Sequence, residues 1–243
     1  MLSCGFQLAD GDFCRWAADD LCRDIISRFA AAANMEIVSG LAGNASYYSP
    51  EKWQMTGVRL RALFYSGLLP YLESGRAGVF HGILVNNVLV CGVSGVGKTT
   101  LCRRLDGIAD IYADDAVLVQ VTDGKLTGKP CPTWSRYIRD IEAPHSCDIN
   151  KSIVINKLLF LERGDTPGIH PLPSSLLTAK LMRASSDLYY RIFSSTLSEE
   201  RLAALSSAQL ALSVAVRSCC DSSALVVPLT HQLPEDFLSL LKL

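Results

Sequence analysis

The chain has 243 residues, of which 49% are hydrophobic, and its formal net charge is −1. This suffices for a sizeable buried core, either as one large domain or as a main domain with a small accessory piece. A charge near zero offers no basic surface, so we expect no binding to nucleic acid or to membrane surfaces. No signal-like start and no uninterrupted apolar window of about 20 residues is present, which predicts a cytoplasmic protein.

Residues 1–77 are predicted to form a small N-terminal accessory α/β segment that presents substrate to the remaining chain. The expected elements are a strand at 6–8, a helix at 16–33, a strand at 35–38 and a helix at 58–72. Residues 78–243 are predicted to form the main domain.

Two apolar runs, 79–85 and 88–93, flank Asn86 and Asn87. An asparagine pair suits a two-residue hairpin turn with positive φ, so the runs are predicted to pair as antiparallel strands.

The register of this hairpin would place one histidine in a notable position. If Val85 faces Val88, stepping back along both strands sets His81 opposite Gly92. The alternative is a histidine that simply satisfies its polar atoms within the sheet.

Residues 92–99 read GVSGVGKT and fit a phosphate-binding loop: Gly, four residues, Gly, Lys, then Ser or Thr. Glycines let backbone N–H groups turn toward phosphates, the lysine adds a point charge, and a hydroxyl can bind Mg²⁺. The buried run 88–91 before the loop and the predicted helix at 99–105 after it supply the strand and helix that this motif requires. The residues expected to bind the nucleotide are Gly92, Ser94, Gly95, Val96, Gly97, Lys98, Thr99 and Thr100.

Asp114 and Asp115 end the segment 111–115 (IYADD), and a second apolar run follows at 116–121. Adjacent carboxylates behind a phosphate loop need a cation or hydrogen-bond donors, and Mg²⁺ is the obvious cation. Because neighbouring side chains of an extended chain point to opposite faces, only one aspartate is expected to face the substrate. The alternative is a solvated acidic turn.

Arg136 follows a proline-rich segment that also contains Trp134. This pattern suggests a pinned loop whose cation meets the transferred phosphate or an acidic substrate. An arginine packed over an aromatic ring is the equally weighted alternative. Farther along, we predict helices at 173–193 and 198–218, a strand at 224–227 and a closing helix at 234–243.

The stretches HGILV, VLVCGVSGVGKTTLCRRL and YADDAVLV resemble the core of the bacterial HPr serine kinases and, more loosely, of ATP-type phosphoenolpyruvate carboxykinases. This likeness covers about residues 79–121. A weaker one, over residues 1–190, is to HPr-kinase-related proteins encoded beside radical SAM enzymes in SynChlorMet-type peptide-modification cassettes. Its marks are 130–136 (PCPTWSR) and 157–163 (KLLFLER).

The resemblance implies an α/β fold with an HPr-kinase-like P-loop core and a mixed sheet. It also implies ATP and Mg²⁺ as cofactors and phosphoryl transfer to an alcohol. In this reading Lys98 and the loop amides hold phosphates, while Thr99 and one aspartate, Asp115 or Asp114, place the metal. Asp114 accepts the hydroxyl proton, His81 tunes or relays it, and Arg136 joins the catalytic set.

The chain departs from HPr kinases at Val93 and Thr100, where those enzymes usually carry acidic residues. We also find no match to their carboxyl-terminal signature after residue 190, so HPr itself is not the expected substrate.

Two function classes therefore remain. The first is a kinase for Ser or Thr of a peptide or protein, such as a ribosomally made peptide, or for a small metabolite. The second is an ATP-binding or ATP-hydrolysing accessory protein that gates a peptide-modifying complex with radical SAM pathway proteins. A carboxykinase is a weaker third reading, and the sequence does not reveal the oligomeric state.

Overall fold

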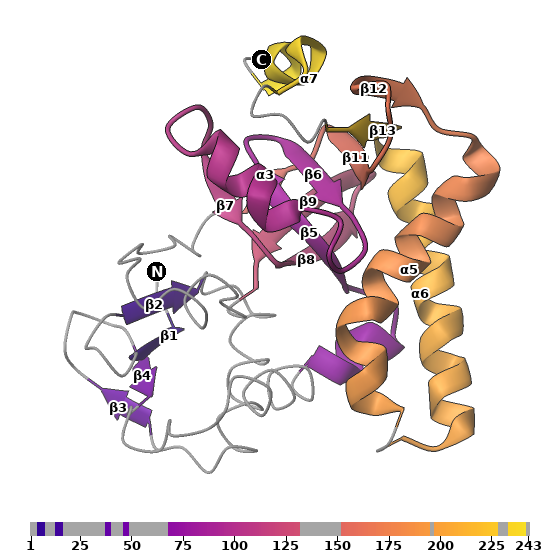
Figure 1. Ribbon diagram of the computed structural model, residues 1–243. Coiled ribbons are helices and arrows are strands. Elements are labelled where there is room, and N and C mark those ends of the chain that lie inside the picture. Colours follow the sequence, from indigo (N-terminus) through magenta and orange to yellow (C-terminus); the bar gives the residue numbers. More distant parts are fainter. Residues whose placement is uncertain are drawn as a thin grey trace. The chain divides into compact units, whose positions relative to one another are not determined.

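The computed structural model describes residues 4–7, 13–16, 37–39, 46–48, 68–131, 152–194, 197–227 and 233–241 (Figure 1). The chain divides into two compact units. The first consists of Met1–Pro70 and Pro132–Ser152, and the second of Tyr71–Cys131 and Ile153–Leu243. We predicted a single division between residues 77 and 78. In the structure the second unit begins at Tyr71, and residues 132–152 belong to the first.

The first unit contains a four-stranded sheet in the order β2-β1-β4-β3. Its strands are β1 (Cys4–Gln7), β2 (Phe13–Trp16), β3 (Ile37–Ser39) and β4 (Ser46–Tyr48). β1 and β3 overlap the strands predicted at 6–8 and 35–38, whereas Trp16, predicted as the first residue of a helix, ends β2. The rest of that helix lies outside the described residues. Residues 58–67 of the helix predicted at 58–72 lie outside them too.

The second unit is built on a mixed nine-stranded sheet in the order β10-β9-β8-β5-β6-β11-β13-β12, with β7 also paired to β5. The strands are β5 (Gly78–Val85), β6 (Val88–Cys91), β7 (Ile111–Ala113), β8 (Ala116–Thr122), β9 (Lys125–Pro130), β10 (Ile153–Val154), β11 (Lys157–Glu162), β12 (Gly168–Pro171) and β13 (Asp221–Val226). β6, β11 and β13 run parallel, and the other pairs are antiparallel.

β5 has different partners along its length. Its first half pairs with β8, from Gly78 opposite Val119 to His81 opposite Ala116. Its second half pairs with β6, and its last two residues also pair with β7 through an irregular register. One long strand thus brings the loop after β6 and the segment between β7 and β8 to the same region.

The predicted hairpin is confirmed. Val85 faces Val88, and Asn86 occupies the turn with φ of 47°. The Asn86 amide also donates to the carbonyl of Leu241 (2.6 Å) and accepts from the N–H of Asp110 (3.0 Å). The turn therefore ties the end of the last helix to the sheet.

Alternating side chains of the central strands form two cores, as expected for a sheet buried on both faces. The helices are α3 (Lys98–Leu105), α5 (Ser174–Phe193), α6 (Glu199–Cys219) and α7 (Glu235–Leu241). On one face Leu84, Leu89 and Phe160 pack with α5 and α6. On the other, Ile83 and Val90 pack with α3 and α7. Figure 1 shows α5 and α6 side by side.

These helices correspond to the four predicted for residues 99–105, 173–193, 198–218 and 234–243, with ends that shift by one or two residues. The strand predicted at 224–227 begins earlier, at Asp221. The structure therefore confirms a mixed α/β fold, while the likeness to the HPr kinase core stays a prediction.

α6 is long and apolar enough to cross a membrane, and within the described part of the chain it is the one helix that meets this criterion. Core helices of soluble proteins meet it too. α6 packs against α5 and buries Leu205, Leu212 and Val216. One of its faces therefore belongs to the core.

Candidate phosphate-binding site

The segment between β6 and α3, which the sequence predicts to be a phosphate-binding loop, contains two glycines with positive φ. Gly95 and Gly97 adopt φ values of 79° and 116°, and no atom lies within 4 Å of a Cβ placed on either residue. Their need for glycine is therefore conformational. Gly97 caps α3, and no side chain satisfies the first N–H groups of that helix at the cap. Such free N–H groups at a helix start bind anions.

Lys98 begins α3 and is 95% buried, with a relative exposure of 5%. Its ammonium donates to the carbonyls of Gly92 (2.8 Å) and Val93 (2.9 Å), so it lies over the first half of the loop. Burial lowers the pKa of Lys98 from 10.5 to about 8, and the nearby Asp115 carboxylate opposes this shift. The site thus holds a poorly solvated cation that an anionic ligand would stabilise.

His81 lies at the mouth of the loop, as the register predicts. The Gly92 N–H donates to the carbonyl of His81 (3.2 Å), and the Gly82 N–H donates to the carbonyl of Asp115 (3.0 Å). These bonds hold the His81 Nε2 atom 3.4 Å from Asp115 Oδ1, with both side chains mostly buried. The structure thus brings the histidine, one aspartate and Lys98 to one place.

Asp114 and Asp115 lie between β7 and β8, and both are half-buried. Of the two, it is Asp115 that pairs with His81 and shifts the pKa of Lys98. Thr99, in the first turn of α3, is half-buried, whereas Ser94 and Thr100 are exposed.

The oxygen ligands available here fit Mg²⁺ better than a metal ion that protein side chains alone would coordinate. The described residues contain no group of three or more His, Cys, Asp or Glu side chains arranged to hold a metal ion. Mg²⁺ commonly uses one or two carboxylates together with phosphate oxygens and water, which Thr99 and one of the two aspartates could complement. Arg136, the remaining candidate, lies outside the described residues.

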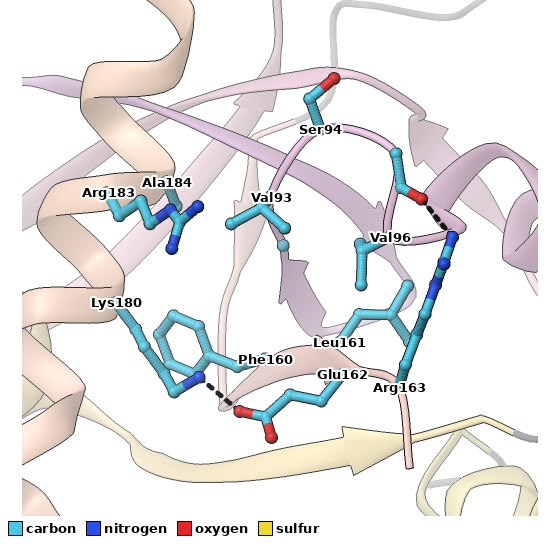
Figure 2. Close-up of a pocket in the computed structure, with 12 residues that line it drawn as sticks. Val93, Ser94, Val96, Phe160, Leu161, Glu162, Arg163, Lys180, Arg183 and Ala184 are labelled. Carbon is cyan, nitrogen blue, oxygen red and sulfur yellow. Dashed lines mark hydrogen bonds and ion pairs between the residues drawn. The ribbon is translucent and has the colours of Figure 1, made fainter.

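A pocket of about 480 Å³ opens beside the first half of the loop (Figure 2). The loop supplies one wall, the end of β11 a second and α5 a third. The lining residues are Gly92, Val93, Ser94, Gly95, Val96, Phe160, Leu161, Glu162, Arg163, Lys180, Arg183 and Ala184.

The sequence patterns did not predict a role for the charged residues of this pocket. Arg163 donates from Nη2 to the carbonyl of Gly95 (2.7 Å), and Lys180 forms an ion pair with Glu162. Arg183 stands on α5 three residues after Lys180, so both occupy one helix face. The sequence contained one usable signal, the Glu-Arg pair that ends the strand at 157–163.

Residues 77–217 match the model of a protein family described as SynChlorMet cassette protein ScmC. The chain belongs to this family. The match spans more than half of the chain and includes the loop, His81, both aspartates and the pocket. Membership of a cassette family suggests partner proteins in a common pathway. The curated proteins contain no match to this chain.

Proposed function

We propose that this ScmC family protein is an ATP- and Mg²⁺-dependent phosphotransferase that phosphorylates a Ser/Thr-type hydroxyl of a peptide or protein. A ribosomally synthesised peptide of the cassette is the substrate we favour. The observation that carries the proposal is the convergence of Lys98, the loop and the His81–Asp115 pair. A loop that only binds nucleotide has no need of a buried histidine–carboxylate pair at its mouth.

In this mechanism the loop N–H groups and Lys98 hold the phosphates, and ATP supplies the phosphoryl group. Thr99 and Asp114 would hold Mg²⁺, which would neutralise charge on the phosphates. The substrate oxygen forms its bond to phosphorus as the bond to ADP breaks, and a carboxylate accepts the hydroxyl proton. Because His81 lies against Asp115, we assign proton acceptance to Asp115, which exchanges the roles that the sequence suggested for the two aspartates.

The test is intact-mass analysis of a synthetic peptide, encoded beside this gene, after incubation with the protein, ATP and Mg²⁺. We expect a product one phosphate heavier. Asp115→Asn should lower the transfer rate at least about 100-fold, the usual contribution of a general base, and leave nucleotide binding nearly intact. Asp123→Asn is the matched control, because Asp123 lies in the exposed β8–β9 turn.

The alternative is an accessory protein that gates a peptide-modification complex, and membership of a cassette family favours it as the second candidate. It predicts ADP release without a phosphorylated peptide. A small-metabolite kinase predicts a phosphorylated small molecule and an unmodified peptide. Cytoplasmic location, where ATP is present, is part of each proposal.

A further inference from the structure

The pocket beside the loop opens at the terminal-phosphate end of the site. In phosphate-binding loops the lysine reaches the β and γ phosphates, while the nucleoside lies at the other end of the triphosphate. Here the Lys98 ammonium contacts the carbonyls of Gly92 and Val93, and both residues line the pocket. A molecule in this pocket would therefore lie next to the phosphate to be transferred.

The pocket is also positively charged. Arg163, Lys180 and Arg183 contribute three cations against the single carboxylate of Glu162, which leaves a net charge of +2. Lys180 is neutralised by Glu162, and Arg163 is bonded to the loop. The Arg183 guanidinium forms no hydrogen bond or ion pair with the described residues, and Figure 2 shows it extending from α5 toward the loop. It remains available for an anionic partner.

Size and lining indicate that this partner is an organic molecule. A volume of about 480 Å³ is in the range of sites for small organic ligands, well above the room that one phosphate requires. Phe160, Leu161 and Ala184 give the pocket apolar walls between the cations (Figure 2). Aliphatic carbon with a carboxylate at its end, as in a glutamate side chain, matches apolar walls with a cationic rim.

We propose that this pocket is the acceptor subsite and binds a carboxylate side chain that flanks the accepting hydroxyl, so that the substrate is an acidic peptide. This inference rests on the proposed phosphotransferase function. Arg183 makes the main contact with the carboxylate, and Arg163, once released from Gly95, adds a second.

Binding experiments on the full chain test the subsite without turnover. The probes are two fluorescein-labelled peptides, EESEE and KKSKK, measured by fluorescence anisotropy, together with a fluorescent ATP analogue. We expect the acidic peptide to bind at least about tenfold more tightly than the basic one. Arg183→Gln should weaken the acidic peptide about tenfold, equivalent to about 1.4 kcal/mol, and leave nucleotide affinity unchanged.

Arg217→Gln is the matched control, because Arg217 is exposed near the end of α6 and does not line the pocket. It should change neither affinity. Equal binding of the two peptides, or a loss of nucleotide affinity alone in Arg183→Gln, would overturn the proposal. In the second case the cations would serve the nucleotide phosphates. Acidic-peptide binding through Arg183 without any phosphorylated product would instead refute the phosphotransferase and keep the peptide site.

Discussion

Replacing Lys98 by Met should stabilise the ligand-free protein while it weakens nucleotide binding. The lysine is buried, and its pKa falls from 10.5 to about 8. A shift of about 2.5 units corresponds to about 3 kcal/mol of unfavourable free energy for the charged form in the folded state. Met removes this penalty but also loses the two hydrogen bonds to loop carbonyls, which costs roughly 1–2 kcal/mol of folding free energy. The net expectation is a gain of about 1–2 kcal/mol at pH 7.

The pH dependence of this gain follows from the direction of the shift. Between about pH 8 and pH 10.5 the unfolded chain retains the lysine proton that the folded chain has lost, so wild-type stability rises with pH in this window. The advantage of Lys98→Met should therefore be full below pH 8 and fade toward pH 10.5. Urea unfolding followed by circular dichroism at several pH values measures it.

The same variant should bind a fluorescent ATP analogue about 10- to 100-fold more weakly, because a charged hydrogen-bond partner of the phosphates is gone. Arg217→Gln again serves as the control for loss of one positive charge at the surface. A Lys98→Met protein less stable than wild type at pH 7, or a stability difference that does not vary with pH, would refute the reasoning about burial.

Three further outcomes are expected. Gly97→Ala should lower the free energy of unfolding by about 1–3 kcal/mol through backbone strain at φ of 116°, and it should also weaken nucleotide binding. Gly107→Ala, at φ of 73° beyond α3, should lower stability without changing nucleotide affinity. Urea unfolding measures the first effect and nucleotide titration the second. Burial raises the pKa of Cys91 to about 12, so peptide mapping after iodoacetamide at pH 8 should find it unmodified in the folded protein, and rapid labelling there would contradict the buried position. Asn86→Ala should cost about 1–3 kcal/mol in unfolding experiments, because the turn loses its bonds to Leu241 and Asp110; an unchanged midpoint would show that those bonds contribute nothing.

Local patterns were enough to predict the hairpin and the order of strand, loop and helix that follows it. The asparagine pair determines a two-residue turn, and a two-residue turn determines the register, so the place of His81 opposite Gly92 follows from chemistry within a dozen residues. The helices were predictable for the same reason, since their apolar periodicity lies within each segment.

The partner of His81 could not be read from such patterns. Which aspartate meets the histidine depends on how β5 pairs with β8 and on the irregular register with β7. Neighbouring carboxylates look alike in the sequence, and a shift of one residue exchanges the faces on which they lie. The pocket could not be predicted from the sequence for a related reason. Arg163 and Arg183 lie 20 positions apart, and only the packing of α5 beside β11 and the loop brings them to one site.

Gly92 connects the two sides of the site. Its N–H bonds to His81 on the β5 side, while on the β11 side a Cβ placed on it would lie 3.4 Å from Leu161 and 2.8 Å from the Val96 side chain. A contact of 2.8 Å is shorter than real Cβ atoms show, so a larger residue here would force the Val96 side chain to move. Because β6 pairs with β5 and β11 at the level of Cys91, one residue before Gly92, both neighbouring strands hold the start of the loop in register. The histidine–carboxylate pair and the cationic pocket therefore keep fixed positions on opposite sides of Gly92. With the flanking carboxylate side chain held in the pocket, the accepting hydroxyl on the neighbouring residue would reach across Gly92 to Asp115.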